Sequence, residues 1–418
     1  MAEYISLQKL HNQNKSSDRW SIVREEANKR LNAESSYRTG IEIATGEIFL
    51  AMPTQLSTLS ERLLRVERKV SHLWRDLPRI AKWAYFRGLI IDEMVSTNET
   101  EGIHSTRRQI ADAMESALSQ TTQSPNQKTK RFTEFAKLYL QLTDENPIYP
   151  RKPSDIRIIY DAVMAGELKE DEQPDGEFFR KESIDIVASH KTIHRGIVPE
   201  AKIISMLEQM IHLVDSSGIP PLFSAVISHF LFEYIHPFYD GNGRTGRYLL
   251  ALYLGRSLSL TTVMSMSRTI AENKNKYYRS FERAENPLNQ AELTFFVIQM
   301  LEFIRTAQDY AIEDLENKTS MLSQTKDTLH EKLEKAYDLT IKETSILYMV
   351  IQQHLFDVFS EITLADIVEN SSMQTQTARN QTLKLVEKGI LQQISLRPLR
   401  FKLTEKVLKE LSISDVFI

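Results

Sequence analysis

Residues His236 to Arg247 read HPFYDGNGRTGR and combine a potential general base, a carboxylate, glycines and two guanidinium groups. The imidazole of His236 can accept a proton from a hydroxyl at neutral pH. The carboxylate of Asp240 stands directly before a glycine, and Mg²⁺ usually takes one or two carboxylates together with phosphate oxygens. Arg244 and Arg247 are three positions apart, so on a helix they share a face that suits a polyphosphate.

Gly241, Asn242 and Gly243 lie between this carboxylate and the arginines. Glycine permits backbone angles that are closed to other residues and lets a ligand approach the backbone closely. Successive amides in such a turn form an anion-binding nest, and a helix expected from about Arg244 to Leu254 would point its amino terminus at the same anion. Each feature alone is common in proteins without a nucleotide, but their joint occurrence predicts a nucleotide-phosphate site.

The neighbouring segments predict how these groups are held. Leu222 to Ile235 is apolar enough for a buried helix. Pro237 interrupts that helix, and the residue before a proline is pushed toward extended geometry, so we expect His236 at the helix end, pointing into a loop. Strand signals at Gly40 to Met52 and at Ser183 to Val198 predict extended segments, the second of them a hairpin.

The run from His236 to Arg247 matches every fixed position of HxFx(D/E)GNGRxxR, and the chain therefore resembles the Fic family over roughly Ile90 to Leu301. The resemblance implies a mainly α fold, namely a helical core with a short β-hairpin flap. It implies an enzyme that transfers AMP from ATP to Ser, Thr or Tyr hydroxyls of proteins, with Mg²⁺ as the cofactor. It also implies that an unknown target protein docks on the flap at 185–198 by strand addition.

The resemblance further assigns roles within the motif. His236 would be the general base, Asp240 would hold Mg²⁺ against the phosphates, and Phe238 would be a buried anchor of the loop. The nucleotide-binding residues would be Gly241, Asn242 and Gly243, which form the anion hole, Arg244 and Arg247, which bind the outer phosphates, and Thr245 and Gly246, whose amides face phosphate.

A second motif lies upstream, where Val95 to His104 read VSTNETEGIH. Thr97 and Glu101 are four positions apart, so they share one face of a helix, and Gly102 follows. This resembles the inhibitory pattern (S/T)xxxE(G/N) of Fic proteins with an N-terminal inhibitory helix. The resemblance implies that Glu101 pairs with Arg247 and blocks productive placement of ATP, because Arg–carboxylate pairing is strong. In some members the same Glu activates a water that removes AMP, and the sequence leaves this activity open.

Helical periodicity, as at Asp155 to Leu168, dominates the chain, and polar stretches suggest its boundaries. The C-terminal order of helices and a hairpin at Leu396 to Arg400 resembles a winged helix-turn-helix domain. With eight Lys/Arg against seven Asp/Glu from Glu361 onward, DNA binding and a protein-binding or dimerisation role stand about level. The predicted domains are a mostly helical region with the inhibitory helix (1–125), a Fic catalytic core (126–312), a helical linker (313–339) and the winged domain (340–418).

The composition excludes several other classes of protein. The chain has no cysteine, so disulfides, thiolate metal sites and a Cys nucleophile are excluded. A net charge of −4 argues against a protein that coats nucleic acid along its whole length. The polar N-terminus lacks a signal peptide and no apolar segment is long enough for a bilayer, so we expect a cytoplasmic protein without a membrane partner. The sequence leaves open whether the chain forms a homodimer.

Three further patterns are expected to be structural. His190 and His194 are spaced for a metal on a helix, but they lie in the expected hairpin without a nearby carboxylate cluster. We expect Trp74 and Trp83 in the core, and the acidic run Glu167 to Glu172 in a solvated loop. Two other functions stay open, namely a nucleotide-sensing, DNA-binding transcription regulator and a Fic enzyme that transfers another nucleotide group.

Overall fold

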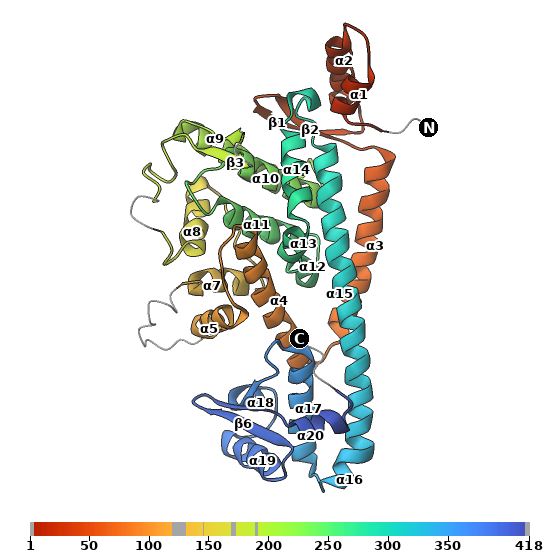
Figure 1. The fold of residues 1–418 in the computed structure, drawn as a ribbon, viewed down its shortest axis with the longest axis vertical. Coiled ribbons are helices and arrows are strands. Elements are labelled where there is room, and N and C mark those ends of the chain that lie inside the picture. Colours follow the sequence, from red (N-terminus) through yellow and green to blue (C-terminus); the bar gives the residue numbers. More distant parts are fainter. Residues whose placement is uncertain (1–3, 119–130, 145, 169–172, 189–190, 414–418) are drawn as a thin grey trace. The chain divides into compact units, whose positions relative to one another are not determined.

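A computed structural model describes residues 4–118, 131–144, 146–168, 173–188 and 191–413. The protein is mainly helical, as the sequence predicts, and carries small antiparallel sheets (Figure 1). The chain divides into two compact units, residues 1–68 with 90–308, and residues 69–89 with 309–418. Three helices contribute residues to both units, namely α3 (Thr54–Asp76), α4 (Arg79–Thr100) and α15 (Thr294–Thr328).

The first unit contains both sequence motifs. The elements that lie wholly within it are α1 (Leu7–Gln13), α2 (Arg19–Leu31), β1 (Ser36–Ile43), β2 (Gly46–Ala51), α5 (Arg107–Leu118), α7 (Thr133–Gln141), α8 (Pro153–Val163), β3 (Asp185–Ala188), β4 (Lys191–Arg195), α9 (Glu200–Asp215), α10 (Pro221–Ile235), α11 (Asn242–Leu254), α12 (Leu260–Val263), α13 (Met266–Glu272), α14 (Lys274–Ala284) and the short 3-10 helix η2 (Pro287–Asn289).

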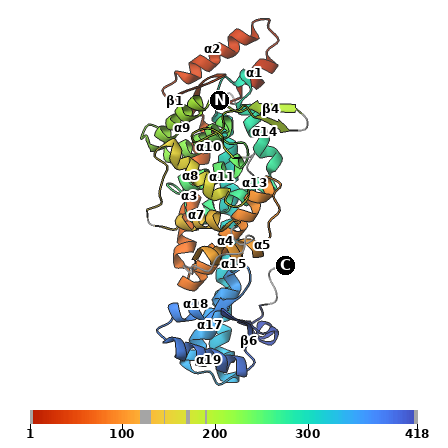
Figure 2. The same ribbon diagram turned by 90° about the vertical axis from the view of Figure 1, so that its left-hand side faces the viewer.

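Helix α10 is buried along nearly its whole length and packs against α9 and α11 (Figures 1 and 2). This confirms the buried helix predicted from the apolar run. The helix ends at His236, which has a left-handed backbone with φ 51° and donates its amide to the Phe232 carbonyl at 2.9 Å. The expected extended geometry of His236 is therefore wrong. The left-handed conformation lets this amide satisfy an orphan carbonyl before Pro237 stops the helix.

Two hairpins in the first unit lie where strand signals were found. The early signal at Gly40 to Met52 belongs to a hairpin, because β1 begins already at Ser36 and pairs antiparallel with β2. In the second hairpin β3 pairs antiparallel with β4, and Asp185 lies opposite Arg195 with its carboxylate 2.8 Å from the Arg195 Nε. His190 lies outside the described residues.

The segment after α8 differs from its prediction. The helix ends at Val163 with Met164 as its cap, five residues before the predicted end at Leu168. Glu167, expected in a solvated loop, has a side chain only 10% exposed and pairs with Arg244. The prediction is wrong here because acidic composition does not reveal a buried partner far along the chain. Residues 169–172 of the same run lie outside the described residues.

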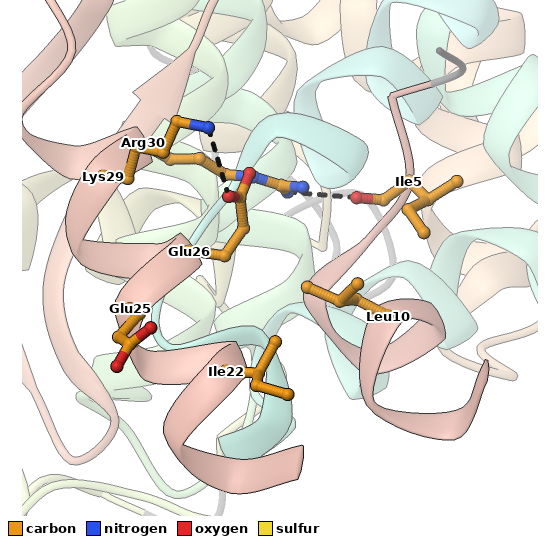
Figure 3. A pocket seen from close by; sticks show the side chains of 7 residues that line it. All are labelled: Ile5, Leu10, Ile22, Glu25, Glu26, Lys29 and Arg30. Carbon is orange, nitrogen blue, oxygen red and sulfur yellow. Dashed lines mark hydrogen bonds and ion pairs between the residues drawn. The ribbon is translucent and has the colours of Figure 1, made fainter. Parts of the chain in front are cut away.

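The N-terminal helices α1 and α2 form a small hydrophobic cluster of Leu7, Val23 and Ala27. The buried Arg30 of α2 lies 2.9 Å from the Glu292 carboxylate, which ties this helix pair to the rest of the unit. Arg30 Nη1 donates to the Ile5 carbonyl at 3.0 Å, and the two residues line a pocket of about 450 Å³. Figure 3 shows how these two residues lie. Its lining residues are Ile5, Leu10, Ile22, Glu25, Glu26, Lys29 and Arg30.

The second unit has its own hydrophobic core, to which Leu347, Phe356, Leu385 and Phe401 contribute. Its small sheet has the antiparallel order β5-β7-β6. The helices and the hairpin predicted for the C-terminal region are present, whereas its assignment as a winged domain stays a prediction. The elements are the π-helical turn η3 (Leu329–Leu333), α16 (Glu334–Ala336), α17 (Ile341–Phe356), β5 (Ile362–Thr363), α18 (Leu364–Glu369), α19 (Thr375–Glu387), β6 (Leu391–Leu396), β7 (Leu399–Leu403) and α20 (Glu405–Glu410).

The two tryptophans expected in the core differ in burial. Trp74 is partly buried against the core of the second unit, whereas Trp83 is 36% exposed, so the prediction is wrong for Trp83. Helical periodicity alone does not tell which apolar side chains of a helix face outward. Within the part of the chain that the structure describes, no helix combines the length and apolarity needed to cross a membrane.

Candidate active site

His236 is held at the turn between α10 and α11 by a buried arginine. Arg180, fully buried, donates from Nε to the His236 carbonyl at 2.8 Å, from Nη2 to the Ile235 carbonyl at 3.3 Å, and from Nη1 to the Glu182 carbonyl at 2.6 Å. The His236 ring contacts the Glu233 carbonyl through Nδ1 at 3.3 Å. Because a carbonyl only accepts, Nδ1 carries the proton in the neutral ring and Nε2 carries the lone pair.

Arg180 was not singled out from the sequence. It stands outside the motif, and a lone arginine in a loop gives no signal of burial. Its hydrogen bonds fix the backbone at the end of α10 and so determine the position of the His236 side chain.

The loop that follows is closed by Asn242 and anchored by Phe238. The Asn242 side chain accepts from the Phe238 amide at 3.0 Å and donates to the Phe238 carbonyl at 2.7 Å. Phe238 is fully buried, as expected, and stacks on Tyr160 with ring centroids 3.6 Å apart. Asp240 is exposed at the rim, where its Oδ1 accepts from the Gly241 amide at 2.7 Å.

The glycines of the motif stand where other side chains meet the backbone. Gly241 caps α11 with φ 76°, and a side chain on it would overlap the Met164 sulfur. A side chain on Gly243 would overlap the Glu101 carboxylate, and one on Gly246 would overlap the Glu233 carboxylate. The first amides of α11 therefore form a cradle that the Glu101 carboxylate already approaches.

Arg247, only 2% exposed, is held by the end of α4 and by the residue that follows it. Its Nε donates to the Thr97 hydroxyl at 2.7 Å, its Nη2 donates to the Thr97 carbonyl at 3.0 Å, and the same Nη2 lies 2.7 Å from Glu101 Oε1. Gly102, with φ 74°, ends the helix directly after Glu101. Burial alone would raise the pKa of the Glu101 carboxyl, but the positive charge of Arg247 more than offsets this and lowers the pKa.

Arg244 is equally buried but has different partners. Its side chain is 1% exposed, and its Nη1 lies 3.0 Å from Glu167 Oε2 while Nη2 donates to the Met164 sulfur at 2.8 Å. Its Nε and the hydroxyl of Thr245 are buried without a hydrogen-bond partner among the described residues. Such buried groups can be satisfied by water or by a polar ligand.

Three buried titratable residues beside this site were not found from the sequence. Glu93, one turn before Thr97 on α4, accepts from the Ser267 amide at 2.9 Å, the Ser267 hydroxyl at 2.5 Å and the Tyr139 hydroxyl at 3.3 Å. Burial raises the pKa of Glu93 to about 7. On α10, burial raises the pKa of Glu233 to about 8, against the opposing charge of Arg247.

The third residue is His229 on α10. Its Nδ1 contacts the Gly246 carbonyl at 3.2 Å and therefore carries the ring proton, while Nε2 accepts from the Tyr277 hydroxyl at 2.8 Å. Burial lowers the pKa of His229 to about 3, so its ring is neutral at physiological pH. All three residues lie on helices that are rich in apolar residues. Helical periodicity therefore gave no sign that these titratable side chains are packed beside the motif.

Comparison with known proteins adds the family. Residues 150–254 match the family described as Fic/DOC. This chain contains a Fic domain. The domain includes Glu167 and the run from His236 to Arg247, whereas Thr97 to Gly102 lie upstream of it.

Curated relatives of the Fic domain share its name. "Protein adenylyltransferase Fic" of Drosophila yakuba is 27% identical over 148 residues, which are 35% of this chain and 28% of that protein. Its namesake in Drosophila willistoni is 28% identical over 138 residues, which are 32% of this chain and 26% of that protein. The chain thus spans about a quarter of the length of these relatives.

A solved structure extends the likeness beyond the Fic domain. A Fic family protein from Desulfovibrio desulfuricans G20 is similar with a TM-score of 0.53 and 17% identity, over 85% of this chain and 97% of that one. At this identity the likeness shows a shared fold.

Proposed function

We propose that this protein transfers AMP from ATP to hydroxyl groups of target proteins. The observation that carries the proposal is the assembly, at one helix turn, of His236, the exposed carboxylate of Asp240, the amide cradle of α11 and the two buried arginines. The names of the curated relatives support the same reaction.

The chemistry follows from the placement of these groups. The target hydroxyl oxygen attacks the α-phosphorus, its proton passes to His236 Nε2, and the bond to the bridging oxygen of the β-phosphate breaks, releasing pyrophosphate. The α11 amides stabilise the charge that develops on the α-phosphate, and Arg244 and Arg247 bind the outer phosphates. Thr245 and Gly246 lie in the first turns of α11, where their amides can add to this cradle.

The residues present fit Mg²⁺ with ATP. Asp240 is exposed at the rim of the cradle and oriented by the Gly241 amide, and one carboxylate together with phosphate oxygens is a usual magnesium ligand set. Bound there, Mg²⁺ would neutralise phosphate charge. Among the described residues there is no cluster of three or more His, Asp or Glu that would hold a metal without the nucleotide.

We further propose that Glu101 keeps the enzyme quiet. Its carboxylate lies 2.7 Å from Arg247 and approaches Gly243 so closely that it takes up space where phosphate would lie. Thr97 supports the same arrangement through two hydrogen bonds to Arg247, and Gly102 permits the turn that ends the helix.

Labelled ATP tests this proposal. The Glu101→Gly protein, incubated with MgATP and candidate targets including itself, should deposit label from the α-phosphate and none from the γ-phosphate. Label from the γ-phosphate would indicate phosphate transfer instead, and no label in either arm would contradict the proposed reaction. A protein carrying both Glu101→Gly and His236→Ala is the matched control and should stay unlabelled.

The backbone of the β3–β4 hairpin suggests where the target docks. It is an antiparallel two-stranded ribbon close to the His236 end of α10, since the Ile197 amide donates to the Ile235 carbonyl at 3.1 Å. A two-stranded ribbon has open edges, so an extended target segment could add to it as a further strand at 185–198.

Glu101 favours a second activity, removal of AMP from a modified target. Because its pKa is lowered, the carboxylate is ionised at neutral pH, and beside the phosphate cradle it could activate a water. Wild-type protein should then release AMP from a pre-modified target, and the Glu101→Gly protein should not.

For the second unit, DNA binding is a candidate function. The exposed face of α19 carries Gln376, Arg379, Asn380 and Lys384, side-chain types that read base edges. A mobility shift with duplex DNA that weakens steeply with salt would support it, and no shift at low salt would contradict it.

A further inference from the structure

The pairing of Arg244 with Glu167 lies outside both sequence motifs. Both side chains are buried, at 1% and 10% exposure, and Nη1 lies 3.0 Å from Oε2. A buried ion pair gains little net stability, because removing both charges from water costs about as much as their attraction returns. A gain in stability therefore does not explain the pair, and a role in the candidate active site has to be considered.

The segment that carries Glu167 packs against the turn between α10 and α11, next to Gly241. The Met164 sulfur accepts from Arg244 Nη2 at 2.8 Å and packs directly against Gly241. Glu167, three residues later, approaches the same guanidinium through Nη1. Its other oxygen lies 3.4 Å from Arg131 Nε, so a second cation stands beside the carboxylate. Glu101, by contrast, approaches the cradle itself at Gly243.

We propose that Glu167 is a positioning residue for the nucleotide, which holds the guanidinium of Arg244 in place for the outer phosphates. A guanidinium has five N–H donors, so the contacts to Glu167 and Met164 leave donors for a phosphate, among them the buried Nε that lacks a partner in the described part of the chain. Fixing a long side chain before the ligand arrives removes an entropy cost from binding. This inference rests on the proposed function only in that Arg244 binds phosphate.

The test uses the full chain with Glu101→Gly as the parent, so that the inhibitory carboxylate is absent. AMP transfer is measured against MgATP concentration for the parent and for proteins that add Glu167→Gln, Glu167→Asp or, as control, Glu134→Gln, an exposed carboxylate on α7. Glu167→Gln keeps the shape but loses the charge, and should raise the ATP KM about tenfold while kcat changes less than about twofold. Glu167→Asp should raise KM about threefold, and Glu134→Gln should match the parent.

A binding measurement separates this inference from the proposed reaction. Titration with a fluorescent ATP analogue should rank the Kd values of these proteins in the same order as their KM values. This measurement does not depend on AMP transfer. A parent that binds ATP without transferring AMP would contradict the proposed function alone. Unchanged KM and Kd in Glu167→Gln, or a loss confined to kcat, would overturn the positioning role. If circular dichroism shows that Glu167→Gln does not fold, Glu167→Asp decides by the same criterion.

Discussion

Arg244 and Arg247 stand three residues apart on α11, and both are buried against a carboxylate, yet their surroundings differ. Arg247 is held by Thr97 and Glu101, and the Glu101 carboxylate approaches the amide cradle of α11 at Gly243. The carboxylate on Arg244 comes from the supporting segment after α8. An arginine–carboxylate pair beside a ligand site therefore does not by itself indicate inhibition. Its place relative to the cradle decides whether we infer competition with phosphate or support for it.

His236→Ala should have the largest effect on AMP transfer. It tests whether the chemical step can be lost while both arginines still bind ATP. In the Glu101→Gly background, loss of the proposed base should lower AMP transfer by about 10³-fold or more. The Kd for ATP should stay within about twofold, because the proposed phosphate contacts come from the two arginines and the α11 amides. A large loss of ATP binding in a folded protein would show that His236 itself contributes to the phosphate site, beyond the arginines and the α11 amides.

Arg180→Lys tests whether the backbone at His236 is set independently of the arginines. Lysine keeps the charge, but its single nitrogen cannot hold the carbonyls of Ile235, His236 and Glu182 together. We expect kcat to fall about tenfold with little change in the ATP KM. Arg279→Lys, on the exposed face of α14, is the control and should behave as the parent. An unchanged kcat would contradict the role of Arg180.

Ser267→Ala weakens the attachment of α4, the helix that grips Arg247. It removes the 2.5 Å hydrogen bond from the Ser267 hydroxyl to Glu93, one turn before Thr97. The cost of moving Glu101 away should fall by about 1 kcal/mol, so wild-type transfer should rise about fivefold. In the Glu101→Gly background the same change should add nothing, and an equal rise there would show that Ser267 acts by another route.

Glu233→Gln has the smallest expected effect on activity and tests the electrostatics beside Arg247. The folded protein keeps a proton on Glu233 up to about pH 8, whereas the unfolded chain releases it near pH 4.3. Stability should therefore fall as pH rises between these values. Urea unfolding at pH 5 and pH 8 should show that the variant loses about 3 kcal/mol less than wild type. Equal losses would contradict the raised pKa of Glu233.

The sequence predicted the parts of the site that are local. Within the run from His236 to Arg247, one turn and one helix start position the residues. Within the run from Thr97 to Gly102, one helix end does so. The structure brings Glu101 to Arg247. The buried helix before the motif followed from its apolar run in the same way. The wrong expectation at His236 arose because a cap hydrogen bond competes with the preference imposed by Pro237.

The parts that the sequence could not predict depend on contacts between distant residues. Glu167 is separated from Arg244 by 77 positions and Glu93 from Ser267 by 174, and nothing local marks these pairs. Composition even pointed the wrong way, since an acidic run reads as a solvated loop. Arg180 was missed for a similar reason, because two of its partners are backbone carbonyls more than fifty positions away and the third is the carbonyl two positions on.

The most direct test of the account compares AMP transfer by wild type, Glu101→Gly and Glu99→Gly. Glu99 is an exposed residue in the last turn of α4, so its substitution places a glycine two positions from Glu101 while the Glu101 carboxylate keeps its contact with Arg247. With α-labelled ATP and Mg²⁺, Glu101→Gly should transfer AMP about 10–100-fold faster than wild type, the range expected from freeing one charge-assisted pair. Glu99→Gly should stay at the wild-type level. Equal rates in all three proteins would contradict the claim that Glu101 holds Arg247 away from ATP.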